Sequence, residues 1–529
     1  MLSLNNNKGS MLIIVLVASS LLIVILVGAI SSANLQLKLN LQKVSNAQAL
    51  HIAEAGINYY RWVLYHNNFD FCNSETCKPG PNYGPYGPYS YKNDTGQVIG
   101  YYELYITPPE SNKAQNVKIK ATGWTVRDPR IKRSIEVVAG LTSWASYNVI
   151  SNGFFRTLTN YTGKVHGNSG ISFQGYGKSN SEVSSTLTEF NDPDHGNALV
   201  IFSGNTATDK LEYGIHYDDD KDLFDHPLGI PLDPFVDGTC AAGRTCTPEF
   251  QPTRADVFPK GRVLGAPAIG FDLLNLHVSN ALILASTSGV VLEPSGVKGY
   301  HLTIIPNPTA TDTIAVRKVN KEFGDCGFDG TAKSCQSIRH DAGAEDPPFY
   351  ITIPTNGIVF VKDKIWIDGT INNDRVTVYA FGGSLSGNTT DIITNNDLRI
   401  TSSSTDKIGL IAQRSILVGY ESADNLTIDA DLIAKNGYLR RDCYSLAYAK
   451  AAANNAANNG GIGLNWTYLG RNSITINGSN ATSGRGAYSC TSGSYYTNTY
   501  QNFDDNMANN PPPNFPTTGN YKFLSWREL

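Results

Sequence analysis

The N-terminal part of the chain is a long apolar segment with no charged residue between Gly9 and Leu37. Within it, Met11 to Ile30 forms an apolar run of twenty residues. In a helix, about 1.5 Å of rise per residue lets such a run cross the ~30 Å hydrocarbon layer of a bilayer. The segment therefore predicts a membrane-spanning helix.

The sequence that follows predicts that this helix continues beyond the membrane. No proline occurs before Pro79. Apolar residues recur at spacings of three and four, which places one apolar stripe along a helix; they are Leu50, Ala53, Ile57, Tyr60 and Leu64. We therefore expect one helix over residues 10–65, apolar in its first half and amphipathic in its second.

The stretch from Gln48 to Ile57, QALHIAEAGI, resembles the AEAG segment of PilX-type minor pilins in the type IV pilin class. The resemblance implies that residues 1–9 are a leader, which a prepilin peptidase removes after Gly9 to leave Ser10 as the N-terminus. It further implies that the apolar helix inserts in the membrane and assembles with other pilins or the pilus machinery. Ile14 stands where major pilins carry Glu, which favours a rare subunit, a tip or priming component, or a membrane-held relative.

Two other interpretations of the N-terminal segment remain open. A secretory signal peptide could be cut after Ser31-Ser32-Ala33, although Lys8 alone is a weak basic region and the apolar run is long for such a peptide. A plain single-pass anchor has the same composition as a pilin helix. The AEAG resemblance favours the pilin interpretation over both.

Three runs with alternating polarity follow the predicted helix. One face of each is apolar, and the inward positions are Tyr102, Leu104 and Ile106, then Val117, Ile119 and Ala121, then Ile135, Val137 and Ala139. A period of two with polar residues between the apolar ones indicates a half-buried antiparallel sheet. We expect residues 66–143 to form a β-meander that packs on the helix, giving an α+β, pilin-like unit.

From residue 144 to residue 529 the sequence changes to short β-branched runs separated by Gly, Asn and Asp. The clearest runs include Ala198 to Phe202, Ala281 to Leu284, Ile358 to Val361, Val376 to Tyr379 and Ile408 to Ile411. Segments such as SYNVISNG and KIGLIAQRSILV also resemble large exported bacterial proteins that join a PilX-type leader to a β-helical passenger. We expect a right-handed parallel β-helix, with a sandwich or meander as the alternative because no strict repeat length emerges.

The eight cysteines are consistent with disulfide bonds in an oxidising compartment. Proximity in the sequence pairs Cys72 with Cys77, Cys240 with Cys246, Cys326 with Cys335, and Cys443 with Cys490. Zinc binding is the alternative, but no pair has the two-residue gap of a zinc knuckle.

The sequence contains no recognisable catalytic motif, and we expect neither enzymatic activity nor a cofactor. Asp218, Asp220 and Asp222 form a candidate calcium set because carboxylate oxygens suit that ion. The set lacks the central Gly and terminal Glu of an EF-hand, so we expect a solvated acidic loop without a metal.

These features predict a single-pass membrane protein whose bulk lies outside the cytoplasm, at the cell surface or on a pilus. Charged residues make up only 17% of the chain and its net charge is −4, which argues against nucleic acid as the main partner. We expect a minor pilin-like protein that displays its β-rich part for adhesion or recognition of a surface or glycan. The alternatives are an exported β-helical carbohydrate-active enzyme and a passive membrane-anchored envelope protein.

Overall fold

The computed structural model describes residues 8–66, 71–78, 83–108, 116–174, 177–191, 211–218, 257–327, 335–450, 456, 459–484 and 495–529. These residues form two compact units, each with its own core. The first unit contains the N-terminal part of the chain up to Leu141 together with Gly519–Leu529, and the second contains Thr142–Thr518.

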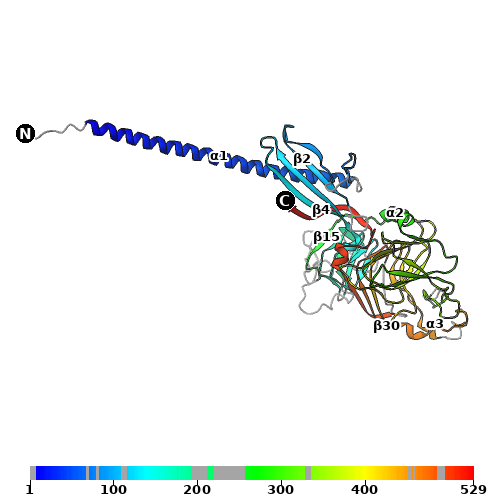
Figure 1. Ribbon diagram of the computed structural model, residues 1–529. Coiled ribbons are helices and arrows are strands. Elements are labelled where there is room, and N and C mark those ends of the chain that lie inside the picture. The colour runs from blue at the N-terminus through cyan, green and yellow to red at the C-terminus, as the bar shows by residue number, and fades with distance from the viewer. Residues whose placement is uncertain are drawn as a thin grey trace, which may run out of the picture. The chain divides into compact units, whose positions relative to one another are not determined.

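The first unit is built on one helix, α1 (Lys8–His66), which is 59 residues long (Figure 1). From Leu12 to Leu39 its large apolar side chains are exposed. From Ser45 onward one side of the helix is buried, and Ala53, Ile57, Tyr60 and Leu64 of the predicted stripe are at most 2% exposed. The predicted change from an apolar to an amphipathic helix is confirmed.

The buried side of α1 packs on a five-stranded sheet. Its strands are ordered β1-β2-β3-β4-β33, with β1 (Tyr86–Lys92), β2 (Val98–Thr107), β3 (Asn116–Thr125), β4 (Lys132–Ser143) and β33 (Thr517–Glu528). Strands β1 to β4 pair antiparallel in sequence order. All nine residues predicted to face inward from the three alternating runs are buried, so the predicted β-meander is confirmed.

The last strand of this sheet comes from the C-terminus of the chain. Leu529 donates its N–H to the carbonyl of Ser134 at 2.9 Å, and Trp144 donates its N–H to the carbonyl of Pro516 at 2.9 Å, so β33 runs antiparallel to β4. Tyr521 is buried in the core beside α1. The predicted boundary of 144–529 for the β-rich part is therefore wrong at its end, because residues 519–529 belong to the first unit. The second unit is inserted between two neighbouring strands of one sheet.

The second unit contains a ten-stranded sheet in which every described pair of neighbours is parallel. Its strands, from one edge to the other, are β15 (Arg262–Leu264), β11 (Val183–Ser185), β8 (Val165–Gly167), β5 (Val149–Ser151), β31 (Asn480–Thr482), β28 (Asp431–Ala434), β25 (Lys407–Ala412), β22 (Arg375–Ala380), β20 (Ile358–Val361) and β16 (Val290–Leu292).

The order of these strands shows that the chain enters the sheet in its middle. Strand β5 comes first, and the next strands extend the sheet to one edge at β15. The following strand, β16, lies at the opposite edge, and later strands fill the sheet back to β31, which pairs with β5. The first and last strands of the sheet are thus neighbours, which allows the chain to leave the second unit near the place where it entered.

A second large sheet takes its strands from the segments that follow strands of the first sheet. Its main path is β19 (Phe349–Thr352), β18 (Thr313–Val319), β17 (Gly299–Ile305), β21 (Ile365–Ile371), β24 (Leu398–Ile400), β27 (Asn425–Asp429), β30 (Gly470–Asn477) and β32 (Tyr495–Asn502), with β23 (Ile392–Ile393), β26 (Ile416–Val418) and β29 (Leu439–Arg441) beside it. Only the β17-β18 and β18-β19 pairs of this described sheet are antiparallel. Apolar side chains from both sheets form one shared core.

One predicted strand, Ala281 to Leu284, is wrong because these residues lie in helix α2 (Leu273–Ser288). The reason is visible in the sequence: Leu274, Val278, Ala281 and Ala285 recur at helical spacing and are all buried. They pack in one cluster with Phe360 and Tyr379 of the ten-stranded sheet and with Phe515. The other predicted strand in this region, Ala198 to Phe202, lies outside the described residues.

The segment before β33 also packs on the ten-stranded sheet. Arg375, Thr377 and Tyr379 of β22 donate side-chain hydrogen bonds to the carbonyls of Pro511, Pro513 and Asn514. These hydrogen bonds hold residues 511–514, the last part of the second unit before β33, against strand β22.

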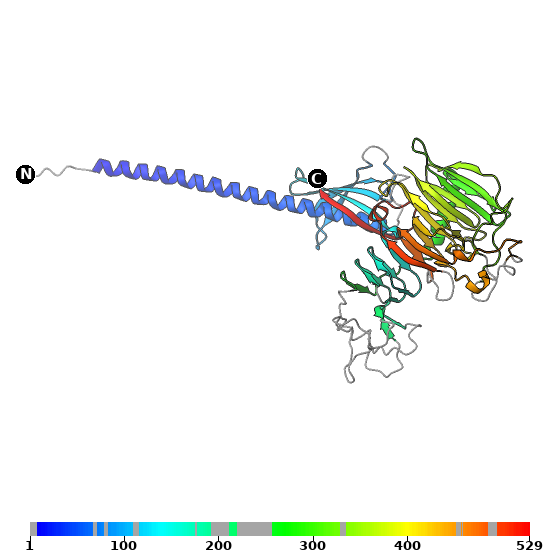
Figure 2. The same cartoon turned by 90° about the horizontal axis from the view of Figure 1, so that it is seen from below.

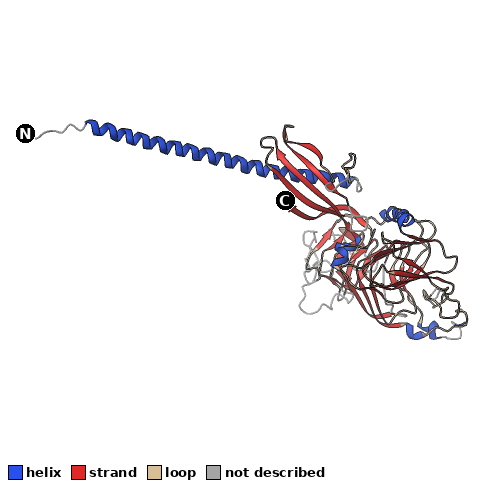
Figure 3. Ribbon diagram, viewed as in Figure 1, coloured by secondary structure: helices blue, strands red, loops and turns tan. Residues whose placement is uncertain are grey.

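The remaining described elements are short. They are a parallel sheet of β6 (Phe155–Thr157), β9 (Ile171–Gln174) and β14 (Ile215–Asp218), the pairs β7 (Asn160–Tyr161) with β10 (Lys178–Ser179) and β12 (Glu189–Asn191) with β13 (Leu211–Tyr213), helices α3 (Leu446–Lys450) and α5 (Asp505–Asn509), and turns η1 (Trp144–Ser146) and η3 (Trp466–Tyr468). The second unit is therefore mostly β (Figures 2 and 3).

Candidate functional site

The first candidate site is the exposed apolar half of α1. Among the described residues, α1 is the one helix long and apolar enough to cross a membrane, a test that a signal sequence also passes. Leu16, Ile23 and Leu37 are each more than half exposed and represent the whole segment. Such a surface is unfavourable in water and requires either lipid or another apolar surface.

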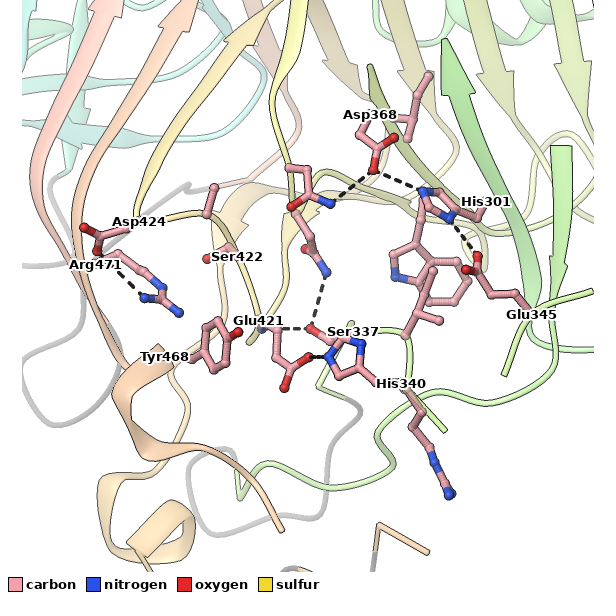
Figure 4. Close-up of a pocket in the computed structure, with 17 residues that line it drawn as sticks. His301, Ser337, His340, Glu345, Asp368, Glu421, Ser422, Asp424, Tyr468 and Arg471 are labelled. Atoms are coloured by element: carbon pink, nitrogen blue, oxygen red, sulfur yellow. Dashed lines mark hydrogen bonds and ion pairs between the residues drawn. The ribbon is translucent and has the colours of Figure 1, made fainter. Parts of the chain in front are cut away.

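The second candidate site is a pocket of about 420 Å³ in the second unit. Strand β17 contributes His301, and β21 contributes Trp366 and Asp368 (Figure 4). The rest of the wall comes from Ile367 and from four other segments: residues 337–340 with Glu345, residues 395–396, residues 421–424, and Tyr468 with Arg471. Aromatic rings, amides and charged groups from distant parts of the sequence therefore converge on one space, as in many binding sites.

His301 lies between two carboxylates. Its Nδ1 is 2.7 Å from Oε1 of Glu345, and its Nε2 is 3.1 Å from Oδ2 of Asp368. Burial opposes the charged imidazolium, but the hydrogen bonds and charges of the two carboxylates outweigh it and raise the pKa of His301 to about 9. At neutral pH His301 is therefore a cation that donates a hydrogen bond to each of the two carboxylates.

A second histidine and acid pair lies on another part of the wall. His340 Nε2 contacts Glu421 Oε2 at 2.5 Å. Burial raises the pKa of Glu421, while His340 opposes that shift. The backbone N–H of Glu421 donates to Ser337 Oγ at 2.9 Å, which holds the two wall segments together.

Arg471 of β30 is the cation on the remaining side of the pocket. Its Nη1 lies 3.8 Å from Asp424 Oδ1, and its Cζ lies 4.1 Å from the centre of the Tyr468 ring. The side chain is 10% exposed. Its Nε and Nη2 are buried and have no hydrogen-bond partner among the residues that the structure describes.

Trp366 provides an apolar wall with a fixed orientation. Its Nε1 donates to the carbonyl of Gln336 at 3.1 Å. On the same strand, Asp368 Oδ2 accepts from Asn396 Nδ2 at 3.1 Å. The pocket thus combines ring faces with amides and carboxylates, a combination that suits a ligand with many hydroxyl groups.

The structure contains two of the disulfide bonds that were predicted from the sequence. Cys72–Cys77 and Cys326–Cys335 are disulfide-bonded, as predicted. Cys443 is also disulfide-bonded, with a partner outside the described residues. Cys240, Cys246 and Cys490 lie outside the described residues as well.

The other predicted site residues are not brought together. Gly9 and Ser10 belong to the first turns of α1. Asp218 ends β14, while Asp220 and Asp222 lie outside the described residues. Within the described ranges, no group of three or more His, Cys, Asp or Glu residues is placed to hold a metal ion.

The pocket was not predicted from the sequence. Its residues extend from His301 to Arg471 and form no local motif, since parallel strands distant in sequence bring them together. One signal of the pocket was present in the sequence. His301, Trp366 and Asp368 occupy alternate positions of their strands, on the side opposite the apolar residues.

No family model matches the chain, and no curated protein matches it. Among solved structures, the crystal structure of the competence-associated pilin ComZ from Thermus thermophilus is similar over 92% of this chain and 97% of that chain, with 10% sequence identity and a TM-score of 0.26. A TM-score this low does not establish a common fold.

Proposed function

We propose that the protein is a pilus-associated, minor pilin-like protein that is held in the membrane by α1 and displays its second unit outside the cell. The observation that supports this most directly is the division of α1 into two halves. The first half exposes apolar side chains on all sides, and the second half is buried on one side against an antiparallel sheet. One helix thereby serves as both membrane segment and core of a folded unit.

This division of α1 distinguishes a pilin-like protein from a protein with a simple membrane anchor. An anchor requires only enough apolar residues to cross the bilayer. Here the helix continues without interruption from the apolar part into the core, so the folded unit and the membrane segment form one continuous element. A helix of this kind can pass from lipid into a filament in which similar helices pack together, as the resemblance to type IV pilins implies.

The second unit is the part proposed to act in recognition, without catalysis. From β20 to β32, each strand of the ten-stranded sheet is followed by one or two strands of the eleven-stranded sheet, and the described pairs are parallel. This order supports a parallel β-helix, and the general rule for parallel crossovers favours a right-handed one. Such a unit presents long polar faces to a surface or a glycan.

The proposal is tested by the N-terminus of the native protein. Processing by a prepilin peptidase leaves Ser10 as the first residue and retains the apolar helix. A secretory signal would instead be removed near Ala33, and a plain anchor would begin at Met1. N-terminal mass spectrometry separates the three outcomes, and a protein that begins at Asn34 excludes the pilin-like function.

A matched pair of variants strengthens this test. Gly9→Val should block processing, because a side chain at this position obstructs the approach of the backbone to the peptidase. Ser10→Ala, at the adjacent position, should still be processed. A filament subunit should be recovered in sheared pili, and it should be absent from that fraction in a strain that lacks the pilus assembly ATPase. A passive envelope protein should remain in the membrane fraction of both strains.

A further inference from the structure

The unpartnered edge of Arg471 is the feature of the pocket that points to a ligand. Nε and Nη2 lie on the same edge of a guanidinium and donate two parallel hydrogen bonds when a carboxylate binds there. In Arg471 both nitrogens are buried and have no partner among the described residues, and the side chain is nine-tenths buried. A buried cationic donor without a partner is costly, so this edge is suited to an acceptor from outside the chain.

Other arginines of the same unit show what this edge binds. Arg339 donates from Nε to Oδ1 of Asp341 at 2.8 Å and from Nη2 to Oδ2 at 2.9 Å. Arg414 contacts both carboxylate oxygens of Asp391 through the same two nitrogens. Both arginines thus use this edge to hold a carboxylate in a bidentate pair.

The acids that line the pocket are arranged so that they leave this edge available. Glu345 and Asp368 are paired with His301, and Glu421 is paired with His340. Asp424 faces Nη1, on the other side of the guanidinium, at 3.8 Å.

We propose that the pocket binds a sugar that carries a carboxylate, with the carboxylate held by the Nε and Nη2 edge of Arg471. This inference rests on the proposed recognition function of the second unit and names its ligand class. The centre of the Tyr468 ring lies 4.1 Å from Cζ of Arg471, whereas a bidentate carboxylate binds in the plane of the guanidinium, at the edge formed by Nε and Nη2. The amides of Asn395 and Asn396 lie on the wall of the same pocket and suit the hydroxyl groups of a sugar.

The test uses the full chain in detergent micelles and isothermal titration calorimetry at neutral pH. Trigalacturonate is the probe, galactotriose is the neutral control, and glucose 6-phosphate tests a phosphate in place of a carboxylate. We expect trigalacturonate to bind at least about tenfold more tightly than galactotriose, because only its carboxylates fill the edge of Arg471. Equal affinity for the two sugars, or binding of glucose 6-phosphate alone, overturns the proposal.

Two matched variants locate the effect at Arg471. Arg471→Lys keeps the charge but removes the bidentate edge, and should weaken trigalacturonate binding by about tenfold or more. Arg399→Lys changes a half-exposed arginine on β24 that does not line the pocket, and should have no effect. Unchanged binding by Arg471→Lys overturns the proposal.

Asp424→Asn provides a test that does not depend on tolerance of the Arg471 variant. The Asp424 side chain is 60% exposed, and asparagine retains an acceptor for the N–H of Asn472. Removal of its negative charge should tighten trigalacturonate binding severalfold, and weaker binding contradicts the proposal. Arg471→Lys should leave the Ser10 N-terminus and recovery in pili unchanged, so a failure of sugar binding is distinguished from a failure of the pilin-like function.

Discussion

Gly123 of β3 lies directly against the backbone of α1 at Ala53, and a Cβ added to Gly123 would be 2.5 Å from the Ala53 nitrogen. The same atom would be 2.5 Å from the carbonyl oxygen of Ala49. Because these neighbours are backbone atoms of a helix, they cannot rotate away as a side chain can. The absence of a side chain at Gly123 therefore sets how closely α1 packs on the sheet.

The first prediction follows from this contact. Gly123→Ala should lower the free energy of unfolding of the first unit by about 1–3 kcal/mol, because α1 must shift away from β3 to accommodate the methyl group. Lys118→Ala, at a half-exposed position on the same strand, is the control. It should change the free energy of unfolding by less than about 0.5 kcal/mol. Urea unfolding followed by circular dichroism measures both, and equal stability of the two variants contradicts the proposed contact.

The second prediction concerns the C-terminal strand β33. Tyr521 is 2% exposed in the core beneath α1, and Tyr521→Ala should destabilise the first unit by about 3–5 kcal/mol through loss of buried area and formation of a cavity. Hydrogen exchange at β4 should become faster, since β33 covers that edge. Trp526→Ala, at a position that is 51% exposed, should leave exchange at β4 nearly unchanged.

The position of β33 also shows how far the sequence determines the fold. The helix and meander were predictable because alternation and helical spacing are local patterns, and Tyr102, Val117 and Ile135 face inward as expected. The pairing of β33 with β4 joins residues nearly four hundred positions apart. Alternation of polar and apolar residues indicates only which face of a strand is buried. It does not show which of the many other strands pairs with β33.

The same limit applies to the pocket and to the order of strands. Register between parallel strands sets His301 beside Trp366 and places Asp368 opposite Thr303, and no local pattern encodes that register. The entry of the chain at β5, in the middle of the ten-stranded sheet, also depends on pairing of β5 with β31. By contrast, α2 could have been recognised from the spacing of Leu274, Val278 and Ala281.

The third prediction concerns the disulfide between Cys326 and Cys335. Both cysteines are buried, and they pack with Phe323, Tyr420 and Tyr444. Replacement of both by Ala should lower the free energy of unfolding of the second unit by about 2–3 kcal/mol, because the unfolded chain gains freedom over a short loop. Differential scanning calorimetry should show a lower melting temperature.

Dithiothreitol provides the control for this prediction. It should lower the melting temperature of the native protein, and it should have a smaller effect on the variant that already lacks Cys326 and Cys335. An identical response of both proteins would show that this bond does not stabilise the second unit.

The last prediction concerns the pH dependence that His301 imposes on the second unit. Its pKa is raised to about 9 in the folded protein, against an ordinary value of about 6.5 in the unfolded chain. The folded state therefore binds the proton more tightly, so the stabilisation is complete below pH 6.5 and is lost as the pH rises through 9. The difference corresponds to roughly 3 kcal/mol.

The measurement is urea unfolding at intervals between pH 6 and pH 10 for the native protein and for His301→Gln. Glutamine retains a hydrogen-bond donor toward the pocket acids but does not titrate in this range. The native protein should lose stability across the window, whereas the variant should be less stable at pH 6 and show a flatter profile. His340→Gln, at a position whose side chain is 72% exposed, should retain the profile of the native protein. A native profile that stays flat between pH 6.5 and pH 9 would show that the carboxylates of Glu345 and Asp368 do not hold His301 in its charged form.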